Sequence, residues 1–235
     1  MRSRMFHLWQ DRPVKTWNPY VGCSFNCSYC WARRMARRLR CEKCREFVPH
    51  VHPERLDPRL VPKDGVVFVG DMGDVACQPR EIRQVMEFIQ EFQRRHPTTF
   101  FFETKSPAFY VLVFPELADL DPGKTIYSAT IETNRPITRQ FSDAPDPDRR
   151  YEAMKLLDGR KHISIEPIMD FDHGAMFRWV TEIEPEIVSV GYDNYHNRLP
   201  EPPLDKTLKL IEDLEASGIA VERKTLRRAW WEVGT

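Results

Sequence analysis

The hydrophobic positions of the chain alternate between strand-like and helix-like spacing. Short apolar runs typical of buried strands lie at 14–22, 65–71, 98–105, 124–133, 161–167, 186–193 and 219–225. Between them, apolar residues recur at helical spacing over 30–40, 79–96, 107–118, 147–159, 174–183 and 203–218. The clearest helix is 79–96, where one face would carry Ile82, Val85, Met86, Ile89 and Phe92.

This alternation predicts about six βα units and a closing strand. Parallel strands need crossover connections about as long as these helices, and no linker, internal repeat or low-complexity tract interrupts the series. We therefore expect the α/β class, with a partial or complete (β/α) barrel. It would form one domain over residues 1–235, with a Cys/His-containing insertion at about 41–62. In such barrels, chemistry takes place at the carboxyl ends of the strands.

Three cysteines follow the first predicted strand. Cys23, Cys27 and Cys30 have the spacing C-x3-C-x2-C in GCSFNCSYC. Three thiolates on one loop can bind three irons of a [4Fe–4S] cluster and leave the fourth iron open, whereas a structural four-cysteine site closes its metal. Chance or a zinc knuckle could produce the same spacing, but its place before a β/α series favours the cluster.

The motif resembles the signature of the radical S-adenosylmethionine (SAM) superfamily. Across roughly residues 16–225, the chain resembles the phage Gp37/Gp68-like branch in TWNPYVGCSFNCSYCWARRMARR, HPERL, VFVGDMGDV, FETKSP, ATIETN and SIEPIM. The resemblance implies a barrel of the radical SAM type and an enzyme that reductively cleaves S-adenosylmethionine. The resulting 5′-deoxyadenosyl radical would abstract a hydrogen atom from an unidentified substrate. A one-electron donor such as a ferredoxin or flavodoxin is also implied.

The same resemblance places cofactor contacts at successive strand ends. The methionine amino group would lie at the segment that contains Gly70, Asp71, Met72 and Gly73, although its aspartates depart from the Glu of the usual Gly-Gly-Glu-type motif. Glu132 matches the ribose-binding region, Lys105 or Arg135 would pair with the methionine carboxylate, and Tyr29 matches the aromatic residue whose backbone meets the adenine. The alternatives are an acidic turn, a surface carboxylate, structural ion pairs and packing beside the cluster.

Polar residues also end the later strands. The candidates for substrate contact are Glu166, Tyr192, Asp193, Asn194 and Lys224. Residues at these positions can face the active centre of a barrel, or they can simply satisfy backbone groups.

A second group of possible ligands lies in CEKCREFVPHVH, which contains Cys41, Cys44, His50 and His52. These residue types suit tetrahedral zinc, and a metal would stabilise an insertion with little core of its own. An auxiliary iron–sulfur cluster completed by Cys77, a redox dithiol and a metal-free segment in which His52 only packs remain alternatives.

Charge is balanced overall, with 35 basic and 35 acidic residues, but residues 1–60 carry 13 Lys and Arg against 5 Asp and Glu. This asymmetry permits an anionic or nucleotide-like substrate. The segment RRMARRLR is either a solvated helix face or a phosphate-binding surface. The rival hypothesis is therefore a non-catalytic iron–sulfur or zinc protein that binds nucleic acid. Such a protein would not need GDMGD and ATIETN at strand ends.

Cellular location follows from what the sequence lacks. We find no apolar run of about 18 residues and no signal-peptide pattern, so we expect a cytoplasmic protein without a membrane partner. In that reducing compartment, the six cysteines are better interpreted as ligands than as disulfides.

Overall fold

The computed structural model describes residues 8–9, 12–114 and 119–232. Its main sheet has the strand order β1-β2-β5-β6-β7-β8-β9-β10. The strands are β1 Leu8–Trp9, β2 Arg12–Trp17, β5 Val66–Val69, β6 Thr99–Thr104, β7 Thr125–Thr130, β8 Arg160–Ile165, β9 Ile187–Val190 and β10 Ala220–Arg223. The seven strands from β2 to β10 are parallel, and β1 runs antiparallel to β2.

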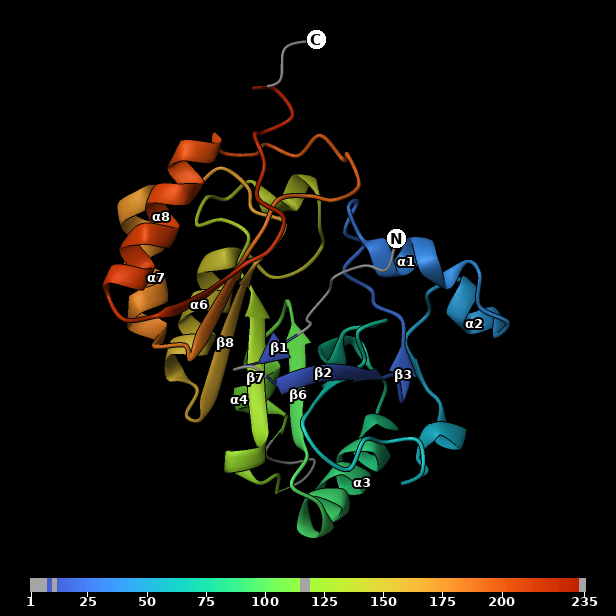
Figure 1. The fold of residues 1–235 in the computed structure, drawn as a ribbon. Coiled ribbons are helices and arrows are strands. Elements are labelled where there is room, and N and C mark those ends of the chain that lie inside the picture. Colours follow the sequence, from blue (N-terminus) through green and yellow to red (C-terminus); the bar gives the residue numbers. More distant parts are fainter. Residues whose placement is uncertain (1–7, 10–11, 115–118, 233–235) are drawn as a thin grey trace.

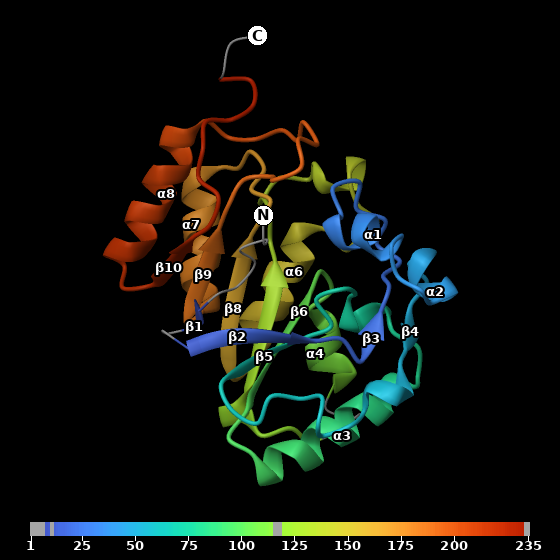
Figure 2. The same ribbon diagram turned by 45° about the vertical axis from the view of Figure 1, so that its right-hand side comes forward.

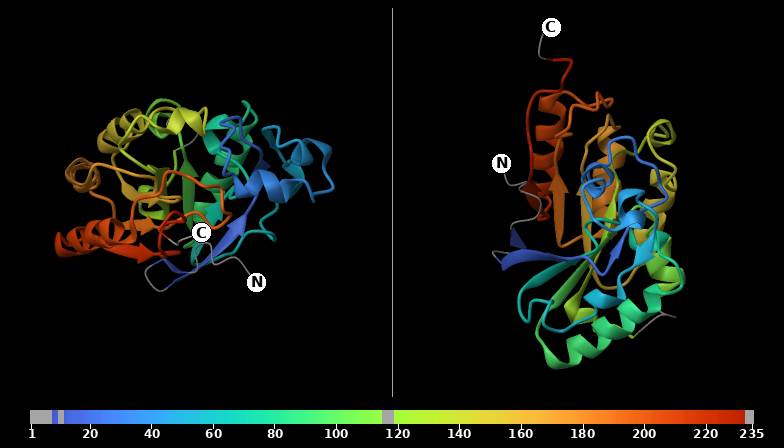
Figure 3. Two further views of the ribbon diagram at one scale, coloured as in Figure 1. Left: turned by 90° about the horizontal axis from the view of Figure 1, so that it is seen from above. Right: turned by 90° about the vertical axis from the view of Figure 1, so that its right-hand side faces the viewer.

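Helices connect these strands and cover one face of the sheet. They are α1 Trp31–Ala36, α2 Glu42–Arg45, α3 Ile82–Arg95, α4 Ala108–Leu112, α6 Pro147–Leu156, α7 His173–Ile183 and α8 Leu204–Ala216. Short 3-10 turns lie at Pro53–Arg55, Val75–Cys77, Pro122–Lys124 and Thr138–Gln140. The strands curve into an open arc, and α3, α4, α6, α7 and α8 lie on its outer side (Figure 1; Figure 3, left). The expected partial barrel is confirmed.

The central strands carry buried apolar side chains on both faces. In β6, Phe100 and Phe102 belong to the main core beneath the helices, whereas Phe101 joins a smaller cluster with Val66 and Phe68. This alternation follows from the two-residue period of a strand. Burial of each large apolar side chain contributes roughly 1.5–3 kcal/mol. Continuous apolar runs are therefore the sequence signature of this sheet.

The first predicted strand, 14–22, is divided in the structure. β2 ends at Trp17, and the chain then enters a separate two-stranded sheet formed by β3 Tyr20–Val21 and β4 His50–Val51. Pro19 lies between them and has no amide hydrogen to continue the ladder. Figure 2 shows β3 and β4 beside α1 and α2, apart from the main sheet.

Two helices are shorter than predicted. The helix expected at 30–40 ends at Ala36, and the helix expected at 107–118 ends at Leu112, with 115–118 outside the described residues. Among the helices described, none combines the length and apolar character needed to cross a membrane.

Candidate functional site

The loop after β3, residues 22–30, carries the three-cysteine motif and is called the cluster loop below. Its backbone is held from two sides. The amide of Cys23 donates to the carbonyl of Phe47 at 3.2 Å. On the other side, the amide of Ser28 donates to Phe141 O at 2.8 Å, and the amide of Asp143 donates to Phe25 O at 2.7 Å. The loop is therefore fixed between the insertion and the segment after β7.

The three cysteines of the cluster loop have separate surroundings. The sulfur of Cys23 accepts from the amide of Phe25 at 3.4 Å, and the sulfur of Cys27 lies 3.2 Å from the hydroxyl of Ser142. Cys30 caps α1, where its sulfur accepts from the amide of Arg33 at 3.3 Å. All three side chains are partly exposed. Separate, accessible thiols fit a [4Fe–4S] cluster, because each thiolate binds a different iron.

Cys77 lies beside the cluster loop. Its sulfur is 3.7 Å from the sulfur of Cys23 and accepts a hydrogen bond from the hydroxyl of Ser24 at 3.3 Å. Cys77 thus contacts the cluster loop, and it is not one of the four residues whose ligand atoms converge in the insertion. Cys77 lies in the loop after β5, and Met72 of the same loop packs against the buried cluster that includes Cys44 and Phe47 of the insertion.

The GDMGD segment, residues 70–74, packs directly on the cluster loop. The amide of Gly22 donates to Met72 O at 3.1 Å, and a Cβ on Gly73 would lie 2.9 Å from Gly22 O. Gly70 has φ +72°, and a Cβ there would meet the Tyr20 ring at 2.0 Å. Glycine at positions 70 and 73 is thus required for this close approach.

The two aspartates of this segment differ in their partners. Asp74 is buried and accepts from the amide of Ala76, the hydroxyl of Thr104 and the amide of Lys105. Oδ1 of Asp71 is buried without a hydrogen-bond partner among the described residues, and burial raises the pKa of this carboxyl. An unpaired carboxylate oxygen beside the cluster loop suits a cationic ligand such as an ammonium group.

Glu132 is the centre of a buried ion network. One oxygen contacts the Tyr29 hydroxyl and the Lys105 ammonium, and the other accepts from Arg150 at 2.6 Å. Glu132 and Arg150 are both fully buried. Burial would raise the pKa of Glu132, but Arg150 and Lys105 outweigh it and hold that pKa down at about 2. Through Tyr29, Glu132 therefore joins the cluster loop to the segment that follows β7. The predicted contact of Glu132 with the ribose stays a prediction.

Arg135 lies farther along the same loop. Its guanidinium contacts Asp170 and pairs with Asp172 at 2.6 Å. These partly exposed pairs match the structural alternative for Arg135. Of the two cations predicted for the methionine carboxylate, Lys105 is the one placed against the cluster loop, with its ammonium 5.3 Å from the centre of the Tyr29 ring.

The substrate-side candidates divide into two groups. Glu166 and Lys224 flank Gly191. A Cβ added at Gly191 would lie 3.4 Å from Glu166 Cδ and 2.8 Å from Lys224 Cβ. Asn194 Nδ2 lies 3.4 Å from Glu166 Oε1. Burial raises the pKa of Glu166 to about 7, although the charge of Lys224 lowers it. These three residues are the ones that the structure brings together.

The other two candidates point elsewhere. Tyr192 is fully buried, and its hydroxyl contacts Pro202 O at 3.1 Å and Thr207 Oγ1 at 2.7 Å. Asp193 shapes its own loop by accepting from the amide and side chain of Asn197. Both match the alternative in which a polar residue at a strand end satisfies local groups.

Sequence reasoning missed a polar layer inside the arc. His162 Nδ1 lies 2.8 Å from the Ser128 hydroxyl, and its Nε2 lies 2.9 Å from Ser189, which donates to Glu222 at 2.7 Å. Burial lowers the pKa of His162 to about 3. Glu103 is also buried, which raises its pKa. The available signal was the pair of alternating polar residues in each of two neighbouring strands, Ser128 and Thr130 in β7 and His162 and Ser164 in β8.

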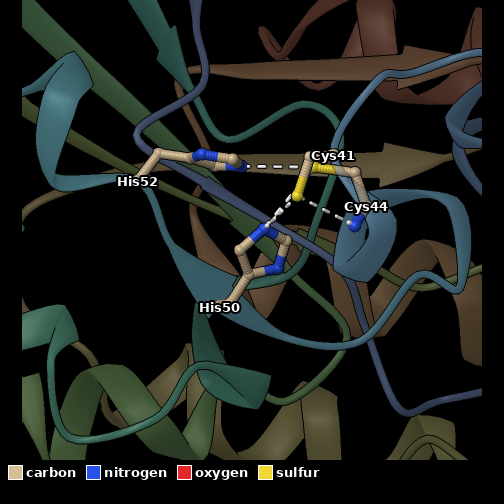
Figure 4. Close-up of side chains that lie close together, drawn as sticks. All are labelled: Cys41, Cys44, His50 and His52. Atoms are coloured by element: carbon tan, nitrogen blue, oxygen red, sulfur yellow. Dashed lines mark hydrogen bonds between the residues drawn. The ribbon is translucent and has the colours of Figure 1, made fainter.

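Cys41, Cys44, His50 and His52 converge in the insertion (Figure 4). Their ligand atoms all lie within 4.8 Å of one another, and the side chains other than Cys41 are buried. The four residues predicted as possible ligands thus lie together, and the arrangement can hold one metal ion.

Solved structures with the same architecture provide the comparison. SuiB of Streptococcus suis bound to S-adenosylmethionine aligns with a TM-score of 0.60 at 12% identity, covering 90% of this chain and 50% of SuiB. A cysteine variant of spore photoproduct lyase aligns with a TM-score of 0.60 at 12% identity, covering 95% and 81%. A further lyase structure, with bound AdoMet and dinucleoside spore photoproduct, gives 0.54 at 12% identity, covering 91% and 64%.

At 12% identity, the likeness to these structures establishes a shared fold. The chain spans about half the length of SuiB. No family model and no curated protein matches the sequence.

Proposed function

We propose that this protein is a radical SAM enzyme in which Cys23, Cys27 and Cys30 hold a [4Fe–4S] cluster. The main support is one juxtaposition: three partly exposed thiols on one loop, packed against a glycine-containing segment at the carboxyl end of a half-barrel. Parallel barrels carry their chemistry at that end. The neighbours that share this fold include structures with bound S-adenosylmethionine.

The cluster and S-adenosylmethionine, when bound, supply one-electron cleavage of the 5′ carbon–sulfur bond and a 5′-deoxyadenosyl radical that takes a hydrogen atom from the substrate. The chain's own residues bind and orient the reactants. Asp71 offers an unpaired oxygen to the methionine ammonium, and Lys105 offers positive charge to its carboxylate. Glu132 keeps Tyr29 and Lys105 in place.

The electron must come from outside, and we expect a ferredoxin or flavodoxin as the donor. Ser24, Asn26 and Ser28 are exposed, so the outer side of the cluster loop is open to such a protein. A reducing cytoplasm would keep the six free cysteines available as ligands.

The substrate that we propose is anionic or nucleotide-like. Arginines and exposed aromatic rings lie together on the surface beside α1. Arg34 lies 5.5 Å from the centre of the Tyr195 ring, and Arg198 lies 5.9 Å from the centre of the Trp230 ring. Both rings are exposed. Such pairs suit phosphates and unpaired bases, which stack on aromatic side chains.

Within the superfamily, we propose the phage Gp37/Gp68-like branch. The support is the sequence resemblance in HPERL, VFVGDMGDV and SIEPIM. Membership predicts that proteins of this branch also place an acidic residue at position 71 beside their cluster loop. An alignment of the branch that lacks such a residue would contradict the assignment.

Anaerobic turnover tests the proposal. Reconstituted protein should contain about four irons at the cluster loop. With reductant and S-adenosylmethionine, it should release 5′-deoxyadenosine and methionine. The control is the triple variant Cys23→Ala, Cys27→Ala, Cys30→Ala, which should lose both this iron and the products. Full iron content without any 5′-deoxyadenosine would instead support the non-catalytic nucleic-acid-binding alternative, and a triple variant that keeps all its iron would overturn the cluster assignment.

A further inference from the structure

We propose that Cys41, Cys44, His50 and His52 bind a single zinc ion in a closed, structural site. This inference goes beyond the proposed enzymatic function and does not depend on it. It rests on the distances among the four ligand atoms, on the hydrogen bonds that orient the two imidazoles, and on the position of the insertion against the cluster loop.

The distances between ligand atoms match those around one tetrahedral ion. Zinc lies about 2.3 Å from a thiolate and about 2.0–2.1 Å from an imidazole nitrogen, so a tetrahedral site places sulfur and nitrogen about 3.6 Å apart. The sulfur of Cys41 lies 3.4 Å from His50 Nε2. The sulfur of Cys44 lies 3.5 Å from His50 Nε2 and 3.2 Å from His52 Nε2. Only small adjustments are needed to admit the ion.

Both imidazoles present the same nitrogen to the centre. His50 Nδ1 lies 2.7 Å from the carbonyl of Val48, and His52 Nδ1 lies 2.7 Å from the carboxylate of Glu54. These acceptors hold the proton on Nδ1 and leave the lone pair of Nε2 free to bind a metal. Carboxylate and carbonyl partners of this kind are the usual second layer of histidine–zinc sites.

The same geometry argues against the other metals considered. In an iron–sulfur cluster with two cysteines and two histidines, the histidines bind one iron and the cysteines the other. Here each histidine nitrogen lies within 3.5 Å of a cysteine sulfur, and all four ligand atoms lie within 4.8 Å of one another. The ligands also lack the oxygen atoms that calcium and magnesium prefer. With four protein ligands, the site leaves no open position for catalysis.

The position of the site gives the ion a structural role. The buried cluster around the insertion is small and consists of Val21, Ala32, Ala36, Cys44 and Phe47. His50 lies in β4, which pairs with the strand that leads into the cluster loop. The ion would therefore hold β4 and α2 together at one side of that loop.

Metal analysis of anaerobically purified full-length protein tests the inference. Wild-type protein and the triple variant at positions 23, 27 and 30 should each contain close to one zinc per chain. The double variant Cys41→Ser, Cys44→Ser should lose it and become protease-sensitive around residues 40–60, while the cluster spectrum remains. Cys77→Ser is the matched control, because it removes a partly buried thiol outside the site and should retain zinc.

Two further measurements keep the test decisive if the double variant folds poorly. His52→Cys preserves four ligands and should retain zinc, whereas His52→Ala should release it at a chelator concentration at least about 10-fold lower. X-ray absorption at the zinc edge of wild-type protein should give two sulfur and two nitrogen neighbours. Extra iron and sulfide that depend on Cys41 and Cys44 would overturn the proposal, and so would wild-type protein without zinc or extra iron. Because the triple variant keeps its zinc, failure of the enzymatic proposal would be seen separately.

Discussion

The cluster loop and the insertion use cysteines in opposite geometries. In the insertion, four ligand atoms face one another within 4.8 Å, and their neighbours complete a closed site. In the cluster loop, the sulfurs of Cys23, Cys27 and Cys30 contact three different neighbours and remain partly exposed. The difference shows that spacing identifies ligands, whereas the surrounding groups determine whether a metal would be enclosed or left accessible.

The carboxyl groups near the insertion and those at the strand ends also differ in their pKa values. Glu54, beside the insertion, pairs with His52, and this pairing contributes to its lowered pKa. At the carboxyl ends of the main strands, burial raises the pKa values of Asp71 and Glu166, whereas Arg150 and Lys105 outweigh burial and hold down that of Glu132. Asp71 and Glu166 therefore lack full compensation of their negative charge by neighbouring groups, as expected of residues where ligands bind.

The largest effect should come from breaking the support of the cluster loop at Glu132. Arg150→Met leaves this buried carboxylate with Lys105 and Tyr29 only, so we expect a loss of about 3–5 kcal/mol in the free energy of unfolding. Chemical denaturation measures the loss. Iron at the cluster loop should decrease and zinc should not. Arg149→Met is the control, because Arg149 is exposed on the same helix and its loss should cost less than about 0.5 kcal/mol.

The next largest effect on stability should come from the contact between the cluster loop and the insertion. Gly22 has φ +96°, and a Cβ there would lie 2.4 Å from the carbonyl oxygen of Val48. Gly22→Ala should therefore cost about 2 kcal/mol or more and loosen the backbone before His50. Chelator competition should then remove zinc more readily. Gly174→Ala, where a Cβ meets nothing within 4 Å, is the control. Equal stability of the two variants would show that the regions are not in tight contact.

A smaller effect should appear in the pH dependence of stability. Burial raises the pKa of Glu166 from 4.5 to about 7, so the folded protein retains a proton that the unfolded chain releases. The stabilisation is fully present below about pH 4.5 and is lost as the pH rises through 7, by about 1–3 kcal/mol. Glu166→Gln should remove this loss, so its stability relative to wild type should rise between pH 5 and pH 8. Exposed Glu152→Gln should show no such trend.

The smallest effect on stability is expected at Cys77. Its sulfur lies 3.7 Å from that of Cys23. In cluster-free protein, the mild oxidant diamide should take two hydrogens from these thiols and join them in a disulfide, detectable by peptide mapping. Cys77→Ser should abolish this crosslink and change the free energy of unfolding by less than about 1 kcal/mol. A crosslink of Cys41 to Cys44 in zinc-loaded protein would contradict the closed site.

The sequence predicted those features that depend on nearby residues. The seven parallel strands follow from apolar runs at regular intervals, and the four insertion ligands lie close together in the chain. The departure of β3 from the first strand depends on pairing with β4, a contact that no local pattern contains. Arg150 lies in a helix with several polar residues, yet it is fully buried, where it pairs with Glu132. Long-range ion pairs of this kind have no sequence signature.

The spread of these contacts along the chain also sets an order of assembly during synthesis. The insertion ligands span residues 41–52, so they can meet as soon as this short segment leaves the ribosome. The cluster loop is held by two contacts: the amide of Asp143 donates to Phe25 O, and the hydroxyl of Tyr29 donates to Glu132. Each contact joins residues more than a hundred positions apart in the chain. At about 5–20 residues per second, the second event follows the first by several seconds. Zinc could therefore bind soon after residue 52 is made, whereas an iron–sulfur cluster would find its loop fixed only after residue 143 is made.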